Sequence, residues 1–597
     1  MQNKNSKFSL NYIKIPLINL AELKKQYSNT CLEDTENNYQ PFNIENLQTY
    51  NPICAEFFEM NENNYSKISL NHQNNIIDLN TIENLQTNTL IKRDIFIKFS
   101  PLLDPLRYMT GKYDIDDYKT RTLPSIFTNE TLCIPKLLTY NNASYTDCFF
   151  TFLTSKVLNE NNFIHGLDFY GTFLGIQEKF KMNISDDLDY LNDSKFFVEN
   201  INKYYTVANY KSDDFFKNNS RCNKIKLLID NNDHSIDSNL LVDLDFSEIP
   251  YDNSETECCI SEIYTREPKN TELDDMVIDN LLSDTLCDIN DSVHKINNCE
   301  SDDSDDSDSD SEDEEEDEDE DEEDEDEEED EDEDEEEDDI NEEINENTIA
   351  YINNYPIQMI CMEKCDGTLD DLFEEELINI ENGASYLMQI IMILISYQKM
   401  FKFTHNDLHT NNIMYNNTNI EYLYYTYEKK TYKVPTYGKI IKLIDFGRSI
   451  YSFQKKLFCS DSFDQCGDAN SQYNFPPFFD SKKPLLNPNY SFDLCRLGCS
   501  IFDFVLDIDD MTEIKKMNEL QKIVNEWCTD DNGKNVLYKK NGVERYHNFK
   551  LYKMIARTVN KHLPSAQLHK SYFKQFLYKK NDVNINIMNI DHLPIYV

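Results

Sequence analysis

The chain has 597 residues and a formal net charge of −56, and this is more length than one hydrophobic core needs, so we expect several units or large insertions. The charge is concentrated, because residues 301–339 hold 34 acidic side chains and no basic one, and removing them from −56 leaves −22 for the remainder. A chain that is acidic even outside this tract has no general attraction to nucleic acid or to an anionic membrane surface, so neither is expected as a partner.

The N-terminal third offers few structural signals before residue 91. Residues 1–90 are rich in asparagine with weak periodicity, and we interpret them as an N-terminal extension that partly packs on the next part of the chain. The run IKRDIFIKFS at 91–100 has the alternation and β-branched content of a strand. Apolar residues at helical spacing predict a helix over 144–158, and strand-like content returns over 163–174.

The middle of the chain predicts a long insertion, over about 181–348. Its first part is polar and mixed, and it leads into the acidic tract 301–339. Within that tract Glu312–Asp339 is an unbroken run of 28 carboxylates. Such a run cannot bury apolar surface and repels itself, so we expect a disordered, solvated linker there.

Regular structure is expected again over 349–597. The segment YPIQMICMEKCDGTLDDLF predicts a strand, a turn at Asp366–Gly367 and the start of a helix. Residues 385–401 predict a largely buried helix. Residues 422–439, YLYYTYEKKTYKVPTYGK, predict a β-hairpin.

Two short motifs in this part indicate a chemistry. The first is THNDLHTNNIMY, which has the pattern H-x-D-L-x-x-x-N with its acid at Asp407 and its amide at Asn412. The second is IIKLIDFGRS, an apolar strand that ends in Asp445-Phe446-Gly447. Transfer of a phosphoryl group requires positioning and charge neutralisation more than covalent chemistry. In that reaction Asp407 would accept the proton of an acceptor hydroxyl, while Asn412 and Asp445 would each hold Mg²⁺.

Together the two motifs resemble those of the protein kinase superfamily. His409 stands where most protein kinases have lysine, and Asp445 follows Asp407 by 38 residues. These two features and the segment FDLCRL at 492–497 resemble haspin-like atypical Ser/Thr kinases. The asparagine-rich style also resembles the kinase-like proteins of giant amoeba-infecting DNA viruses. The resemblance covers 91–180 weakly and 349–510 well.

This resemblance implies a two-lobed α+β fold. Residues 91–180 would form the small lobe, which the insertion 181–348 interrupts, and 349–597 would form the hinge and the large lobe. In the hinge, backbone groups of Met362, Glu363 and Cys365 would bind the adenine ring of ATP.

The segment DLCRLG implies a further role for its acid. The resemblance makes Asp493 a buried acceptor that braces the backbone of the catalytic loop. The alternative is an ordinary helix N-cap, because the residues before it are rich in turn formers.

The lysine that would hold the ATP phosphates has a candidate in Lys98, with Lys92 and Lys112 as alternatives. Its expected partner is a carboxylate on the helix 144–158. Asp147 is our choice, because Thr154 stands near the expected glutamate position and Glu160 is expected past the helix end.

Two departures from the kinase pattern affect the nucleotide site. The first glycine is Gly111, so no G-x-G-x-x-G loop precedes Lys98. Its loss should weaken nucleotide binding or require a substitute. His409 would act beside Asp407 as a weaker, pH-sensitive donor to the γ-phosphate in place of a permanent cation.

The sequence therefore predicts a Ser/Thr protein kinase that uses ATP and Mg²⁺ and acts on protein hydroxyls, including those of basic proteins. One alternative is a pseudokinase-like binding protein that captures basic partners with its acidic tract. A small-molecule phosphotransferase is another alternative, because similar D-L-H-x-x-N loops occur in such enzymes.

The compartment is predicted from three absences. Met1–Thr30 does not read as a signal peptide, and no run of 18 apolar residues predicts a spanning helix. The 16 cysteines are scattered without a CxxC pair, which favours reduced thiols. We expect a cytoplasmic protein, in the host cytoplasm if the source is viral, with the virion as an alternative location.

Overall fold

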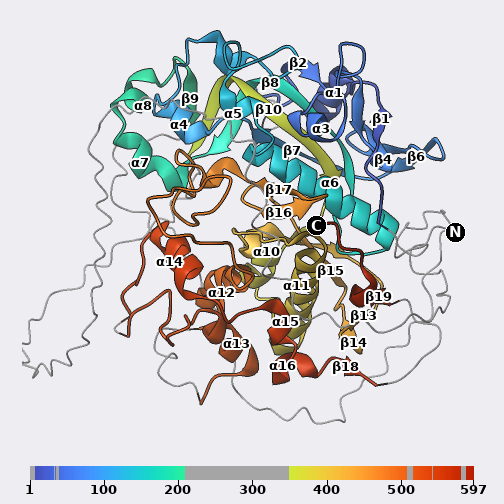
Figure 1. Ribbon diagram of the computed structural model, residues 1–597, viewed down its shortest axis with the longest axis vertical. Coiled ribbons are helices and arrows are strands. Elements are labelled where there is room, and N and C mark those ends of the chain that lie inside the picture. The colour runs from blue at the N-terminus through green and yellow to red at the C-terminus, as the bar shows by residue number, and fades with distance from the viewer. Residues whose placement is uncertain are drawn as a thin grey trace, which may run out of the picture. The chain divides into compact units, whose positions relative to one another are not determined.

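The computed structural model describes most of the chain outside the expected insertion (Figure 1). The described residues are 7–31, 34, 39–208, 348–506, 515–540, 542–579 and 587–597. The acidic tract 301–339 lies outside them. They combine helices with mainly antiparallel sheets, which agrees with the expected α+β class.

The largest sheet has the order β2-β8-β10-β7, with β9 added to β10, and all its pairs are antiparallel. Its strands are β2 (Ile44–Gln48), β7 (Ile95–Pro101), β8 (Phe169–Asn183), β9 (Tyr205–Ala208) and β10 (Ile349–Glu363). The central strands β8 and β10 are buried along most of their length, as expected for strands covered on both faces. Within the described residues β7 is an edge strand, so its outer edge has no partner strand there.

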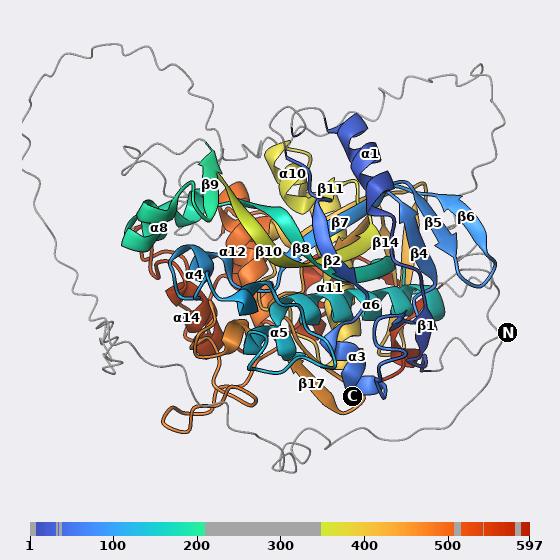
Figure 2. The same ribbon diagram turned by 90° about the horizontal axis from the view of Figure 1, so that it is seen from above.

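Helix α6 (Ala143–Asn161) packs against β8 and β10, and Figure 2 shows it alongside the sheet. Asn142 caps its first turn by accepting from the N–H of Ser144, and the helix ends at Asn162 in the left-handed conformation. The prediction of a helix over 144–158 is confirmed. The helix is longer than expected, so Glu160 lies within it and pairs with Lys156.

The N-terminal residues pack more fully than an extension would. Strand β2 belongs to the main sheet, and Leu23 and Phe42 are buried in the core. The expected boundary at residue 90 falls inside a strand. The further elements of this part are β1 (Tyr12–Lys14), α1 (Leu20–Thr30), α3 (Pro52–Phe57), β3 (Ile68–Leu70), β4 (Asn74–Asp78), β5 (Thr81–Asn84) and β6 (Thr89–Lys92).

Short elements connect the longer ones around the main sheet. The strand expected at 163–174 begins only at Phe169, because a turn precedes it. The first residues of the expected insertion are regular and end in β9, which pairs with β10. The short elements are α4 (Pro105–Met109), η1 (Tyr118–Arg121), α5 (Pro135–Leu138), η2 (Ser185–Asp187), α7 (Leu188–Asn192) and α8 (Lys195–Asn200).

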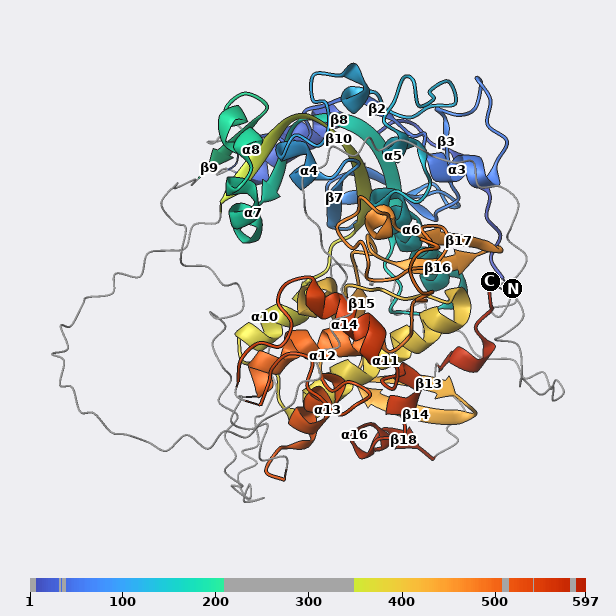
Figure 3. The same cartoon turned by 60° about the vertical axis from the view of Figure 1, so that its left-hand side comes forward.

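The C-terminal half is built around α11 (Ile380–Phe401), which contains the predicted helix 385–401. Its central residues are buried, and it contacts α13, α15, β14 and β15. Figure 3 shows α11, α12 and α13 grouped on the side of the unit away from the main sheet. The other helices here are α10 (Leu369–Glu374), α12 (Phe492–Val505), α13 (Glu519–Trp527), α14 (Lys550–Thr558), α15 (Pro564–Gln567) and α16 (Ser571–Lys574).

Small sheets in this half carry the two motifs. The three-stranded sheet β11-β12-β15 places the loops before β12 and after β15, and the predicted hairpin is confirmed as β13 and β14. The strands of this half are β11 (Gly367–Thr368), β12 (Ile413–Asn417), β13 (Tyr422–Tyr427), β14 (Lys430–Pro435), β15 (Lys439–Leu443), β16 (Ile450–Phe453), β17 (Lys456–Cys459), β18 (Leu577–Tyr578) and β19 (Met588–Asn589). Its short 3₁₀ turns include η3 (Thr410–Asn412), η4 (Asp461–Phe463) and η6 (Ile590–His592).

Aromatic rings join α6 to the C-terminal half. Phe150 of α6 stacks on Phe403 with ring centroids 4.3 Å apart and meets Phe446 edge-on at 4.8 Å.

Within the described ranges, no helix combines the length and apolar character needed to cross a membrane. None of the described cysteines forms a disulfide.

Candidate active site

The pairing of β12 with β15 brings the two motifs to one place. Ile413 lies opposite Leu443 in this antiparallel ladder, and the N–H of Ile444 donates to the carbonyl of Asn412 at 3.1 Å. Asn412 therefore ends one loop at the point where Asp445 begins the next. The register of two short strands sets the relative position of the two expected metal ligands.

Lys98 of β7 reaches both expected carboxylates. Its Nζ lies 2.7 Å from Asp147 Oδ2 on α6 and 2.8 Å from Asp445 Oδ1 after β15. The alternative Lys92 instead donates to Thr81 Oγ1 at 2.7 Å. The structure thus joins Lys98, Asp147 and Asp445 from three separate elements.

Lys98 favours the charged form of both carboxylates in this cluster, while Asp445 repels Asp147 and disfavours its charge. Partial desolvation opposes the charge of Asp445, but the Lys98 ammonium outweighs this effect and lowers the pKa of Asp445 to about 2. Burial raises the pKa of Asp147, although Lys98 opposes that effect. Burial also opposes the charge of Lys98, yet the two carboxylates hold its pKa above the ordinary value. Asp445 is consequently ionised and its side chain is 44% exposed, which leaves it accessible to a cation.

Asp147 also fixes the start of the second loop. Its Oδ1 accepts the N–H of Phe446 at 2.9 Å, so both of its oxygens are engaged. Asp445 itself has a φ of 60°, a left-handed conformation that costs free energy in a residue other than glycine. Thr154, near the expected glutamate position, hydrogen-bonds to backbone oxygens of Thr151 and Leu167 instead.

Asp493 of α12 supports the backbone of the loop that carries Asp407. It is fully buried, and its two oxygens accept the N–H groups of His405 and Asn406, each at 2.9 Å. The N-cap position of α12 is Ser491, so Asp493 is not the cap. The prediction of a buried brace is confirmed, and burial raises the pKa of Asp493.

Asp407 is held by groups that the sequence did not reveal. Its Oδ1 accepts the hydroxyl of Tyr552 at 2.7 Å, and its Oδ2 faces Arg448 Nη1 at 3.6 Å. Burial opposes its charge, but Arg448 and Arg496 outweigh burial and lower its pKa. Arg448 lies in the motif IIKLIDFGRS and Arg496 in the segment DLCRLG. The position of an arginine in each of these segments was the one sequence signal for a cation near Asp407. Tyr552 carries no such signal.

His409 is uncharged in this environment. Burial lowers its pKa to about 4, and its Nε2 faces the Asn412 amide nitrogen at 3.0 Å. Since an amide N–H can only donate, Nε2 is the acceptor in this tautomer. The expectation of a donor to phosphate gains no support here. Arg448 and Arg496 are instead the permanent cations beside Asp407.

The expected cation ligands have free acceptor atoms of the right kind. Asn412 Nδ2 donates to the carbonyl of Asp407 at 2.9 Å, which leaves its Oδ1 without a hydrogen bond from the described residues. The same holds for Asp445 Oδ2. In the described part of the chain no group of three His, Cys, Asp or Glu side chains could hold a metal alone. One carboxylate and one amide oxygen are donors that suit Mg²⁺, which takes one or two protein ligands and completes its shell with phosphate and water.

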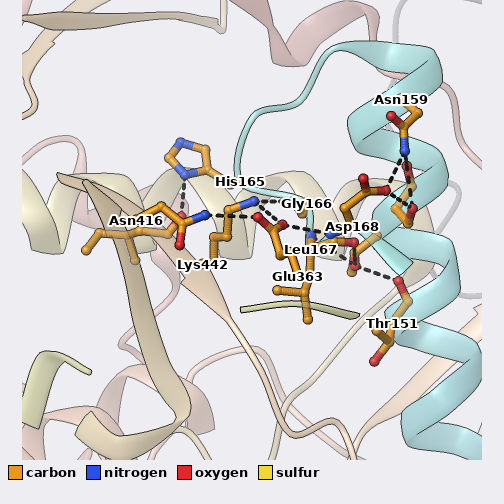
Figure 4. A network of polar contacts seen from close by, with 12 residues as sticks. Thr151, Asn159, His165, Gly166, Leu167, Asp168, Glu363, Asn416 and Lys442 are labelled. Carbon is orange, nitrogen blue, oxygen red and sulfur yellow. Dashed lines mark hydrogen bonds and ion pairs between the residues drawn. The ribbon is translucent and has the colours of Figure 1, made fainter. Parts of the chain in front are cut away.

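The side chain of Glu363 cannot serve a ligand. It is buried, and its Oε1 lies 2.5 Å from Lys442 Nζ and accepts the N–H of Asp168 at 2.7 Å (Figure 4). Its Oε2 accepts from Asn416 at 2.9 Å. The residue ties β10 to β12 and β15, so only its backbone could meet a nucleotide.

The other two expected hinge residues differ in exposure. Met362 is buried, whereas Cys365 is half-buried, which raises the pKa of its thiol to about 12. Glu363 and Cys365 line a cavity of about 1190 Å³. Lys98, Asp147, Asp407, Asn412 and Asp445, together the motif cluster, do not line this cavity.

Comparisons with families and curated proteins identify no relative of this chain. A scan against protein-family models finds no match, and no curated protein matches the chain.

Proposed function

We propose that this chain is a Ser/Thr protein kinase that transfers the γ-phosphate of ATP to a protein hydroxyl. The observation that supports it most is the meeting of Lys98, Asp147 and Asp445, from β7, α6 and the loop after β15. A lysine held between two carboxylates, one of them exposed and ionised, suits a site that binds phosphate and a divalent cation together.

The arrangement of elements supports a two-lobed kinase-like fold. An antiparallel sheet with α6 against it forms one part, and α11 with the surrounding helices forms the other. The segment 362–365 leads from β10 of the first part to α10 of the second. In this proposal the motif cluster lies between the two parts.

Each residue then has a role that its contacts permit. Lys98 holds the phosphates, and Asp147 keeps its ammonium in place. Asn412 and Asp445 provide one oxygen each for Mg²⁺, which would neutralise the charge of the phosphates when bound.

Asp407 would handle the proton. The acceptor oxygen forms a bond to the γ-phosphorus, the bond from that phosphorus to the β,γ-bridging oxygen breaks, and the hydroxyl proton passes to Asp407. Its carboxylate is ionised beside Arg448 and Arg496, as an acceptor of protons must be.

One observation favours a second candidate, a binding protein that transfers phosphate poorly or not at all. A glycine-rich hairpin would pair with the outer edge of β7, and that edge has no partner strand among the described residues. Without such a cover the phosphates are held less tightly. Capture of basic partners by the acidic tract would then be the main activity.

Calorimetry of Mg·ATP binding, followed by radiolabel transfer to a panel of basic proteins and small alcohols, separates these candidates. The kinase proposal predicts binding and transfer to protein, and Asp445→Asn should abolish the Mg²⁺-dependent part of both. Binding of basic protein without transfer would favour the second candidate. Transfer only to small alcohols would favour a small-molecule phosphotransferase.

A further inference from the structure

Tyr552, on α14, reaches Asp407 from far along the chain. Its hydroxyl lies 2.7 Å from Asp407 Oδ1, and the same oxygen lies 2.8 Å from Arg496 Nε of α12. A guanidinium can only donate, so the tyrosine oxygen accepts from Arg496 and its own hydrogen is directed to Asp407. The direction of both hydrogen bonds is thus fixed by chemistry.

The ring of Tyr552 is held from several sides. The guanidinium carbons of Arg496 and Arg448 lie 5.1 and 5.6 Å from its centroid, within the range of cation–π attraction. Phe549 stacks on it with centroids 5.2 Å apart and planes 17° from parallel. Helix α14 is anchored by the buried Leu551 and Ile555 on either side. A side chain clamped in this way is a fixed part of the site.

The consequence lies in the two oxygens of Asp407. Oδ1 carries a short hydrogen bond from Tyr552, whereas among the described residues the basic group that faces Oδ2 is Arg448 Nη1 at 3.6 Å, beyond hydrogen-bond range. The carboxylate therefore has one fixed oxygen and one available oxygen. Its side chain is 23% exposed, so an acceptor hydroxyl can approach.

We propose that Arg496 and Tyr552 are positioning residues that hold Asp407 with Oδ2 toward the acceptor hydroxyl. This inference rests on the proposed kinase function. A misplacement of about 1 Å in such a group can cost about a hundredfold in rate. Loss of this positioning would therefore lower turnover far more than it would weaken the binding of ATP or protein.

The test uses the full-length chain and its Tyr552→Phe variant, which removes one oxygen and retains the ring. We expect kcat to fall about tenfold to a hundredfold, with the KM for acceptor protein and the Kd of Mg·ATP within about twofold of wild type. Tyr538→Phe is the matched control, because Tyr538 donates to Asp503 of α12 at 2.9 Å, outside the motif cluster. It should retain wild-type kcat.

A second variant tests the link to Arg496. Arg496→Met should lower kcat by a similar factor, and Arg496→Lys, which keeps a cationic donor, should lose less. The double variant of Tyr552→Phe with Arg496→Met should lose no more than the larger single loss, because the two residues act as one unit. Melting temperature and Mg·ATP binding identify a variant that folds poorly. The comparison then uses the remaining variants.

The outcomes are separable. A rise in turnover in Tyr552→Phe would mean that the tyrosine blocks the acceptor position, which contradicts the proposed positioning of Asp407. Turnover equal to that of Tyr538→Phe would overturn it as well. If the wild-type chain binds Mg·ATP but transfers phosphate to no acceptor, the proposed kinase function fails and the proposed positioning fails with it.

Discussion

The N–H of Phe446 donates to Asp147 Oδ1 at 2.9 Å, which ties the loop carrying Asp445 directly to helix α6. Asp147 is shorter than the glutamate that the kinase pattern places on this helix, and it is nearly fully buried. It holds Lys98 with one oxygen and the loop with the other. A displacement of α6 would therefore disturb Lys98 and the carboxylate of Asp445 together.

Removing the Asp147 side chain should cost both stability and activity. In Asp147→Ala the N–H of Phe446 loses its acceptor, and an unpaired buried donor costs about 1–3 kcal/mol. Urea unfolding should show this loss, and phosphate transfer should fall because Lys98 loses one of its two carboxylates. The matched control is Glu160→Ala on the same helix, whose pair with Lys156 is partly exposed and should contribute less than about 1 kcal/mol. Equal stability of the two variants would contradict the tie.

Asp493 should stabilise the fold through its hydrogen bonds to the backbone N–H groups of His405 and Asn406. Asp493→Ala leaves the N–H groups of His405 and Asn406 unpaired in a fully buried place, at about 1–3 kcal/mol for each unsatisfied donor. Both melting temperature and turnover should drop. Asp503→Ala, on the same helix but outside the motif cluster, serves as the comparison. An unchanged melting temperature in Asp493→Ala would show that the brace is dispensable.

Acid should destabilise the fold partly through His165. The residue is buried, its Nδ1 donates to the carbonyl of Ile441 at 2.7 Å, and its Nε2 accepts from Tyr425. Burial lowers its pKa to about 3, against about 6.5 in the unfolded chain. Between these values the unfolded chain binds more protons, so this contribution is complete above about pH 6.5 and declines as pH falls.

The measurement is the free energy of unfolding at pH 6.5 and pH 5. One buried histidine of this kind should account for a loss of about 2 kcal/mol over that interval. His165→Asn should be less stable at pH 6.5 but should show a shallower decline. His547→Asn, whose side chain is 72% exposed, should keep the wild-type slope. A wild-type slope in His165→Asn would be the contrary result.

The acidic tract gives a prediction from charge alone, because it lies outside the described residues. Deleting 301–339 removes 34 negative charges. If the tract concentrates basic substrates, the deletion should raise the KM for a basic protein and leave the KM for ATP unchanged. Added salt should narrow the difference, since exposed charges are screened beyond about 8 Å at physiological ionic strength. A higher basal turnover at low salt would instead indicate that the tract screens the site.

The sequence was most informative where neighbours in the chain are neighbours in space. Helix α6, helix α11 and the hairpin at 422–439 follow from local periodicity. Asp407 and Asp445 were predicted because short motifs fix their spacing, and Lys98 was chosen over Lys92 and Lys112 because it ends a strand-like run. The strand β2 and the contact of Tyr552 with Asp407 were not predicted, because pairing over a long stretch of chain has no local signature. Glu363 was expected near adenine, and only the fold shows its side chain engaged with Lys442.

The most direct test of the proposed function is single-turnover transfer of radiolabelled γ-phosphate from Mg·ATP to a basic protein, with wild type and Asp407→Asn compared at saturating ATP. Asn412 and Asp445, the two expected metal ligands, and Lys98 remain in this variant, so nucleotide binding should persist. The proposal predicts transfer by the wild type and a loss of at least about a hundredfold in Asp407→Asn, the scale of one general base. Equal rates in the two proteins, or no transfer by the wild type, would contradict it.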